Sequence, residues 1–338
     1  MKSDLQWLAP AWAQLQQRRA ALPHALLIRG RPGLGKTLLA RAFAQALLCE
    51  SPTSKGDACG TCPACKWFEQ GNHPDFRQVE PEALSAAAGD SEADETTGGK
   101  KKREPSTQIR IEQVRALQDF LAIGTHRAGL RVVVIRPAEA MNVATANALL
   151  KSLEEPPPAT LFILVTSRPD ALLPTIRSRC QAVDVAVPAA EAARAWLEQQ
   201  PDIDDPAAAL AFWGNAPLAA AESAQGDSTL REVLPDVMAK LRDPIEMTDR
   251  LQGYELPEIV SALQKWAYDA LSVRFFGRER YFVGRRDALA GYSKADPVAL
   301  LKLGRKLCRR QRESQHPLNP RLFVEELMID FDALRPAR

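Results

Sequence analysis

The stretch HALLIRGRPGLGKT, residues 24–37, decides the fold. Its first half, HALLIRG (24–30), is an apolar run of the kind that forms buried strands, and the residues after it, TLLARAFAQALLCE (37–50), have helical spacing. A glycine-rich turn joins the two. A strand that leads through such a turn into a helix is the setting in which a phosphate-binding loop is found.

The turn itself, GRPGLGKT (30–37), matches G-x-x-x-x-G-K-[ST] in full. Its glycines let backbone N–H groups close around phosphates, and the start of the helix adds partial positive charge. The lysine of this motif reaches the β- and γ-phosphates, and the threonine binds Mg²⁺. A chance glycine-rich turn is the alternative. We therefore expect ATP/Mg²⁺ binding by Gly30, Gly33, Gly35, Lys36 and Thr37.

Further strand-like runs extend the pattern toward the C-terminus. RVVVI (131–135), LFILVTS (161–167) and QAVDVAV (181–187) are strand-like, and TANALLKSLEE (145–155) is helical. Alternation of strands with helices predicts an α/β domain with a doubly wound parallel sheet.

The strand at 131–135 lacks the acid that nucleotide hydrolysis requires. In P-loop NTPases an acid at the end of a neighbouring strand holds Mg²⁺, and a further residue orients the attacking water. Here Arg136 and Pro137 occupy those positions. A cation at this place would oppose Mg²⁺, and Glu139, one turn on, has the wrong geometry for a residue at the strand tip. We expect nucleotide binding without hydrolysis.

Four cysteines form a compact module within residues 49–65. Cys49, Cys59, Cys62 and Cys65 follow the pattern C-x9-C-x2-C-x2-C. The close spacings allow the thiolates to reach one tetrahedral ion, and a set of cysteines alone favours zinc or an iron–sulfur cluster. We expect structural Zn²⁺, because no redox partner is evident and four protein ligands leave no open position. Free buried thiols are the alternative.

Composition and charge describe an ordinary globular chain. Its 338 residues are 46% hydrophobic and 25% charged, with a net charge of +2 that neither favours nor excludes nucleic acid. The N-terminus does not resemble a secretory signal, and no apolar run is long enough to span a membrane. The expected location is the cytoplasm.

The chain divides into three predicted domains. An α/β domain covers 1–187 and contains a small, polar segment at 81–107 that we expect to be a disordered surface insert. A small helical lid covers 188–226, and a helical C-terminal collar or oligomerisation domain covers 227–338.

Several of these stretches together resemble a known family. HALLIRGRPGLGKT, the cysteine module, NALLKSLEEPPPATLFILVTSRPDALLPTIRSRC (147–180) and the helical C-terminus are similar to bacterial clamp-loader AAA+ subunits. The resemblance covers most of the chain apart from 81–107. Its most specific parts are ANALLKSLEEPP and the motif formed by Ser178, Arg179 and Cys180.

The family contains ATP-hydrolysing gamma/tau motor subunits and a non-hydrolysing delta-prime type, the stator. The absent acids at 136–137 favour the stator type. So does GNAPLAA (214–220), where Pro217 replaces an arginine that the motor pattern expects. Retention of Lys36 and Thr37 leaves nucleotide binding open. A motor subunit is the alternative, and a small-molecule P-loop kinase is a third hypothesis from another class.

The resemblance also implies roles for individual residues. Arg179 matches an arginine that acts in trans on the nucleotide of a neighbouring subunit, where it stabilises charge on the γ-phosphate. A surface salt bridge is the plainer interpretation, and the nearby Arg177 leaves the assignment open. Thr166 matches the polar sensor position beside the nucleotide.

The implied partners are those of a clamp-loader assembly. They are the gamma/tau and delta subunits, with the sliding clamp and primed DNA reached through the complex. As a subunit of the DNA-directed DNA polymerase (nucleotidyltransferase) holoenzyme, the chain would have no catalytic activity of its own.

The helices toward the C-terminus are basic. Residues 274–321 contain thirteen Lys/Arg against four Asp/Glu. This charge suits non-specific contact with a DNA backbone or with an acidic partner, and a solvated face is an equal alternative. For the aromatic residues of this region, Trp266, Phe275, Phe276 and Tyr281, core packing is favoured over base stacking.

Overall fold

The computed structural model describes residues 5–87, 105–122, 125, 129–201, 203–223, 229–316 and 318–335. The chain divides into two compact units, Met1–Val187 and Pro188–Arg338. Among the described residues, no helix is long and apolar enough to cross a membrane.

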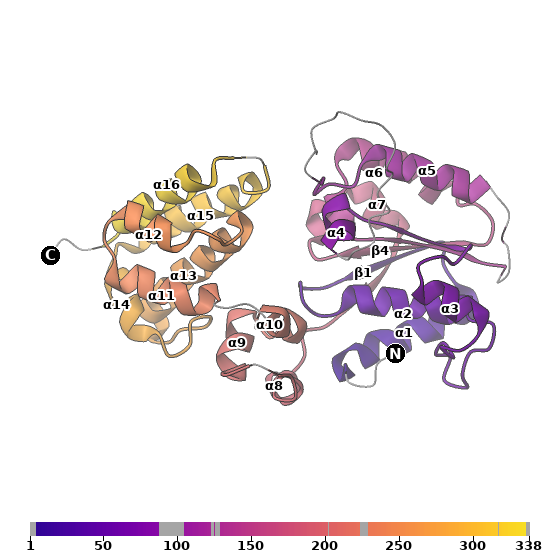
Figure 1. Cartoon of the computed structure of the whole chain (residues 1–338), viewed down its shortest axis with the longest axis horizontal. Helices are drawn as coiled ribbons and strands as arrows, with labels where there is room; N and C mark the ends of the chain where they lie inside the picture. Colours follow the sequence, from indigo (N-terminus) through magenta and orange to yellow (C-terminus); the bar gives the residue numbers. More distant parts are fainter. Residues whose placement is uncertain are drawn as a thin grey trace. The chain divides into compact units, whose positions relative to one another are not determined.

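The first unit is built on a parallel sheet, of which Figure 1 labels β1 and β4. The sheet has five strands in the order β2-β3-β4-β1-β5. The strands are β1 (Ala25–Arg29), β2 (Phe76–Val79), β3 (Arg131–Ile135), β4 (Thr160–Thr166) and β5 (Gln181–Asp184). Every residue of β3 and β4 is buried, which explains why the sequences of both strands, apart from Arg131, Thr160 and Thr166 at their ends, are continuous apolar runs. The predicted fold class is confirmed.

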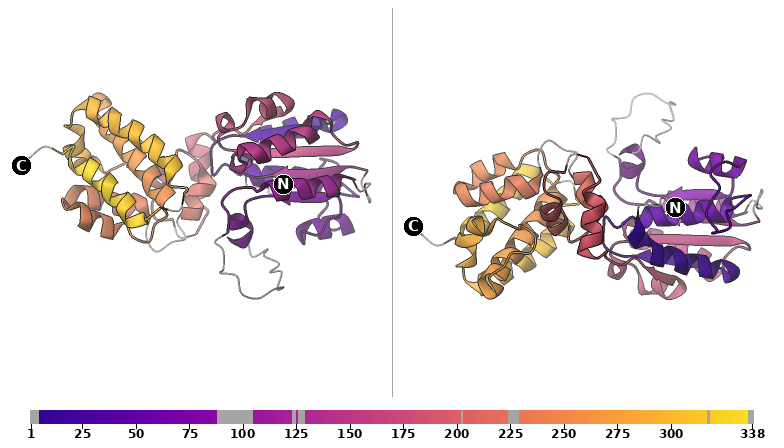
Figure 2. Two further views of the ribbon diagram at one scale, coloured as in Figure 1. Left: turned by 90° about the horizontal axis from the view of Figure 1, so that it is seen from above. Right: turned by 90° about the horizontal axis from the view of Figure 1, so that it is seen from below.

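Helices cover both faces of this sheet. One face carries α1 (Ala9–Gln17), α2 (Lys36–Leu48) and α3 (Pro63–Glu69), and the other carries α5 (Ile111–Ala122), α6 (Val143–Glu154) and α7 (Pro174–Arg179) (Figures 1 and 2). Short 3-10 helices lie at Gln6–Leu8, Arg18–Ala21, Ala138–Ala140 and Pro169–Ala171. The carboxyl ends of the strands meet at one edge, where the candidate nucleotide site lies.

The prediction of a disordered surface insert at 81–107 is partly wrong. Its first part forms the short helix α4 (Glu82–Ala87), and the Ser106 carbonyl accepts a hydrogen bond from the Ala83 N–H at 3.1 Å. Pro81 precedes the helix and an acid lies in its first turn, a combination that favours a helix start. Residues 88–104 lie outside the described part of the chain.

The described part of the second unit is entirely helical. Its helices are α8 (Ala190–Leu197), α9 (Pro206–Phe212), α10 (Pro217–Ser223), α11 (Leu230–Lys240), α12 (Pro244–Arg250), α13 (Leu256–Phe276), α14 (Arg286–Ser293), α15 (Pro297–Glu313) and α16 (Pro320–Asp332). Trp266 is fully buried at the centre of the large core formed mainly by α11–α16. A smaller cluster unites α8, α9 and α10.

The two clusters of this unit touch through α9. The Phe212 ring lies 5.4 Å from the Phe282 ring, so a residue of the predicted lid packs in the large core. The separation of 188–226 from 227–338 as two domains therefore remains a proposal.

Candidate functional site

The phosphate loop connects β1 to α2, as its sequence predicts. Gly33 and Gly35 have positive φ values of 72° and 86°, a region that side chains rarely adopt. A Cβ on Gly30 would lie 2.6 Å from the carbonyl oxygen of Val185. All three positions therefore require glycine, for backbone shape in two cases and for close approach in the third.

Lys36 begins α2 and is buried inside the loop. Its side chain is 6% exposed, and Nζ donates a hydrogen bond to the Arg31 carbonyl at 2.5 Å. Burial lowers the Lys36 pKa to about 8. Thr37 follows it and is half-buried. The donor set suits a nucleotide phosphate, in whose presence the Lys36 ammonium would exchange its bond to the loop for one to the phosphate.

Thr166 lies beside this loop. It is the last residue of β4, and the sheet register pairs it with Arg29, the residue before Gly30. Its hydroxyl is buried and accepts a hydrogen bond from the Arg168 N–H at 3.0 Å. The structure thus brings together all six residues of the predicted nucleotide site at one edge of the sheet.

Arg136, which follows β3, is turned away from the phosphate loop. Its guanidinium forms an ion pair of 2.6 Å with Glu80, which follows the neighbouring strand β2. The side chains of Arg136 and Glu80 are 24% and 8% exposed. Because β2 lies on the side of β3 opposite to β4 and β1, the Arg136 charge is held away from the phosphate loop and is neutralised by Glu80.

Glu139 lies closer to the nucleotide edge than its position in the sequence suggests. It belongs to the 3-10 helix after β3, and its Oε1 accepts a hydrogen bond of 3.0 Å from the Ser167 N–H. Its Oε2 is buried and has no hydrogen-bond partner among the described residues. The hydrogen bond to Ser167 therefore places this carboxylate next to the end of β4, at the edge of the sheet where the phosphate loop lies.

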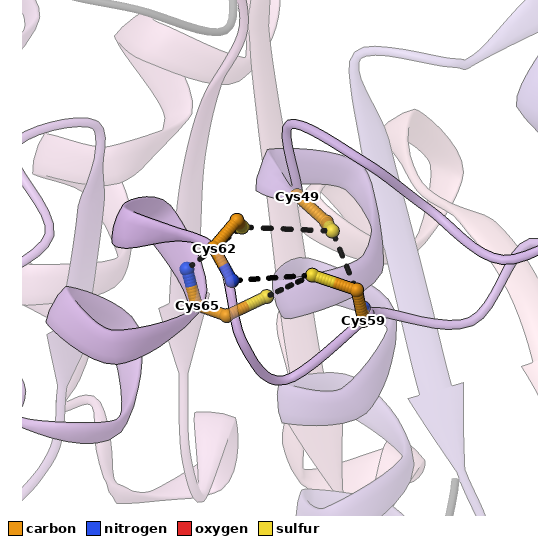
Figure 3. A group of neighbouring side chains, drawn as sticks. All are labelled: Cys49, Cys59, Cys62 and Cys65. Carbon is orange, nitrogen blue, oxygen red and sulfur yellow. Dashed lines mark hydrogen bonds between the residues drawn. The ribbon is translucent and has the colours of Figure 1, made fainter.

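The four predicted cysteine ligands converge on one point (Figure 3). Their sulfur atoms all lie within 4.8 Å of one another, with Cys49 and Cys62 separated by 3.9 Å and Cys59 and Cys65 by 4.0 Å. A tetrahedral zinc with Zn–S bonds of about 2.3 Å separates its sulfur ligands by about 3.8 Å. The cluster has the size that zinc requires.

Local structure fixes each of these thiols. Cys49 ends α2, Cys62 caps α3, and Gly60 has a φ of 72° that allows the turn between Cys59 and Cys62. The Cys59 sulfur accepts hydrogen bonds from the Thr61 hydroxyl and from backbone N–H groups, which lower its pKa to about 6. Ready ionisation of Cys59 favours metal binding, because the thiolate is the ligand, whereas burial raises the pKa of Cys49 and of Cys65.

Arg179 and Arg177 are both half-exposed on α7 and both form ion pairs within the chain. Arg179 contacts Glu154 at 2.7 Å, and Arg177 contacts Asp170 at 2.8 Å. The plainer interpretation of Arg179 as a surface salt bridge therefore describes the isolated chain. Such exposed pairs contribute only about 0–1 kcal/mol, so either arginine could exchange its partner at little cost.

The basic C-terminal helices use much of their charge internally. Lys306 and Arg310 of α15 both contact Glu326 of α16. Lys302 and Arg305 have no acidic partner among the described residues, and they line a shallow pocket of about 410 Å³ with Lys306 and Arg309.

The prediction of core packing for the aromatic residues of this region is half right. Trp266 is fully buried and Tyr281 is partly buried. Phe275 and Phe276, at the end of α13, are 61% and 74% exposed. Neither lies in the core, and both belong to the last turn of α13, which is capped by Gly277.

Comparison with known proteins gives a consistent result. The family model for "DNA polymerase III, delta subunit" matches residues 9–189. A DNA polymerase III subunit delta' from Pseudomonas aeruginosa is 41% identical over 218 residues, 63% of this chain and 59% of that protein. One from Yersinia pestis is 30% identical over 351 residues, 96% of this chain and 94% of that protein.

One solved structure matches almost the whole chain, but its sequence identity is lower than that of the delta' subunits. A DNA polymerase III gamma subunit-related protein from Thermotoga maritima covers 96% of this chain and 99% of its own, with 19% identity and a TM-score of 0.43. At that score the likeness carries no argument.

The parallel sheet, the phosphate loop at its carboxyl edge and the helical second unit define a P-loop protein of the AAA+ type. The matched segments of the first relatives leave more than a third of those proteins uncovered, whereas the match to the Yersinia pestis protein is nearly complete. The chain belongs to the DNA polymerase III delta-prime subunit family of clamp-loader proteins.

Proposed function

We propose that this protein is the stator of a bacterial clamp loader. In this role it binds nucleotide without hydrolysing it and supports the motor subunits as they load a sliding clamp onto primed DNA. Its partners are gamma/tau-type and delta-type subunits, and it acts in the cytoplasm. The similarity of part of the chain to tau subunits, 31% over 157 residues with the Escherichia coli protein, supports a place beside such subunits.

The end of β3 carries this proposal. A hydrolytic site needs one acid for the metal and one group to orient water, and the two positions contain Arg136 and Pro137. The Arg136 side chain is committed to Glu80 on the far side of β3. The phosphate loop therefore has its glycines, lysine and threonine but lacks the acids at the strand tip.

Arg179 would act on the site of a neighbouring motor subunit. A guanidinium brought to the γ-phosphate from outside stabilises the charge that develops in phosphoryl transfer. Arg179 is half-exposed, and among the described residues it is held by Glu154 and a carbonyl of its own helix, so it can be presented to another chain. Arg177 lies on the same helix but pairs with Asp170, so a substitution of Arg177 is the control for one of Arg179.

ATP turnover tests the proposal, first with the full chain alone and then with motor subunits, clamp and primed DNA. The full chain alone should show no Mg²⁺-dependent turnover that depends on Lys36. In the complete loader, Arg179→Ala should lower turnover by about 10³-fold or more at the site it faces, the range known for such arginines, whereas Arg177→Ala should change it little. Robust turnover by the isolated chain would instead support a motor subunit.

The basic face of α15 suits non-specific contact with a DNA backbone. Lys302 and Arg305 have no acidic partner among the described residues, and with Lys306 and Arg309 they line one pocket. Such a cluster attracts phosphates without reading sequence.

The cysteine cluster would hold structural zinc. Four sulfur ligands close the coordination sphere, so the metal would stabilise the segment between α2 and α3 and take no part in chemistry.

A further inference from the structure

The two charged side chains that follow β3 are held on opposite sides of that strand. Arg136 is paired with Glu80 at the end of β2. Glu139 is hydrogen-bonded to the Ser167 N–H, immediately after β4. Because the strand order is β2-β3-β4-β1, the cation lies on the side away from the phosphate loop and the acid lies on the side toward it.

The sheet register locates the Glu139 carboxylate more closely. Ser167 follows Thr166, and Thr166 is paired with Arg29 of β1, from which the phosphate loop begins. The carboxylate is therefore at the edge of the sheet where the loop, Lys36 and Thr166 also lie. Its negative charge raises the pKa of Lys36, although burial, the larger effect, lowers it.

One oxygen of this carboxylate is left without a partner. Oε1 accepts from Ser167, whereas Oε2 is buried and unpartnered among the described residues. An ionised carboxylate accepts up to four hydrogen bonds, and buried acceptors are normally satisfied. An unused acceptor beside a phosphate loop is suited to a water molecule held by a metal ion.

We propose that Glu139 supplies the carboxylate for the magnesium ion of a bound nucleoside triphosphate, in place of the acids that are missing at 136–137. Mg²⁺ keeps several of its waters in nucleotide sites, so Glu139 would act by accepting a hydrogen bond from such a water. The inference rests on nucleotide binding as proposed above. It makes Glu139 a positioning residue and gives no group to activate a water for attack.

The variant Glu139→Gln separates this role from a structural one. The amide oxygen of glutamine can still accept the Ser167 N–H, so the local fold is retained while the negative charge is lost. A matched control is Glu154→Gln, which removes a carboxylate from α6 that is paired with Arg179.

The experiment is equilibrium binding of a fluorescent ATP analogue to the full-length chain, with Mg²⁺ and with EDTA. The parent chain and Glu154→Gln should bind the analogue more tightly with Mg²⁺ than with EDTA, by about tenfold or more, because losing a residue that supports a metal through its ligands typically costs about 10–100-fold in metal affinity. Glu139→Gln should lose this preference. With Mg²⁺ or with EDTA, it should bind the analogue as tightly as the parent chain does in EDTA, and its circular dichroism spectrum should be unchanged.

Two results would overturn the inference in distinguishable ways. Tight nucleotide binding with the same Mg²⁺ preference in Glu139→Gln would remove the role of Glu139 and leave nucleotide binding intact. No binding by the parent chain under either condition would remove nucleotide binding from the proposed function, and the role of Glu139 with it.

Discussion

The guanidinium of Arg136 and the carboxylate of Glu80 lie 2.6 Å apart, at the ends of the adjacent strands β3 and β2. In a hydrolysing P-loop protein the end of this strand provides an acid for the metal. Here the same position provides half of a largely buried ion pair. The strand and its place in the sheet are retained, and its tip connects two strands of the sheet rather than holding a metal ion.

This ion pair predicts a clear stability effect. Glu80→Gln should lower the free energy of unfolding by about 1–3 kcal/mol, because it leaves the partly buried Arg136 charge without an anionic partner. Denaturant titration of the full chain would measure it. Glu154→Gln, which breaks the exposed pair with Arg179, should cost about 0–1 kcal/mol. Equal costs for the two variants would contradict the special role of the pair at β3.

The sequence predicts those elements of the fold whose burial gives a recognisable local run of apolar residues. The β3 bounds agree with the predicted run at 131–135, because four consecutive branched apolar residues, 132–135, follow Arg131 and are all buried. The strand β2, FRQV, was not predicted: it has four residues, of which only the two ends are buried. An edge strand of mixed polarity has no pattern that distinguishes it from a loop.

The site shows the same limit. The glycines, lysine and cysteines were predictable because their motifs are local in sequence. The partners of Arg136 and Glu139 were not, since Glu80 is supplied by another strand and Ser167 by the end of a third. The acid that follows FRQV was the available signal for Glu80, but only the sheet order assigns it to Arg136. The exposure of Phe275 and Phe276 likewise could not be predicted, because it depends on tertiary packing at the end of α13 and not on the local sequence.

The cysteine cluster predicts one tightly held metal ion per chain. Mass spectrometry for metals on the purified protein should find zinc near one equivalent, without the visible absorption of an iron–sulfur cluster. Cys65→Ser should lose the metal and lower the melting temperature, since Cys65 is a buried residue of α3. Cys180→Ser and Cys308→Ser lie outside the cluster and should retain the metal. Loss of zinc in either control would contradict the assignment.

Lys265 of α13 predicts an alkaline gain in stability. Its ammonium lies 3.7 Å from the centre of the Phe212 ring and 4.5 Å from that of Trp213, and burial lowers its pKa to about 8. An unfolded lysine has a pKa of about 10.4, so between these values the unfolded chain binds more protons and stability rises with pH.

The size of this gain can be measured by denaturant titration of the full chain. Between about pH 7.5 and about pH 9.5, Lys265 should contribute about 1–2 kcal/mol to the free energy of unfolding. Lys265→Met has no titrating group and should lack that rise, whereas Lys240→Met, at an exposed lysine of α11, should keep it. If the free energy of unfolding had the same pH profile in the parent chain and in Lys265→Met, the prediction would be wrong. The ammonium would then be as stable beside Phe212 and Trp213 as it is in water.

The basic face of α15 predicts a salt-dependent contribution to DNA binding. Lys302 and Arg305 have no acidic partner among the described residues, so each is available to a phosphate. If both contact duplex DNA, the double variant Lys302→Ala/Arg305→Ala should reduce the slope of log affinity against log salt by about 2 and weaken binding to all sequences alike. Fluorescence anisotropy with a labelled duplex would measure it over a series of salt concentrations.

A matched double variant, Arg194→Ala/Lys240→Ala, removes two cations that already have acidic partners four residues further on or back in the chain and should leave the slope unchanged. An equal reduction in both variants would mean that only the overall charge matters and that α15 holds no phosphate contact.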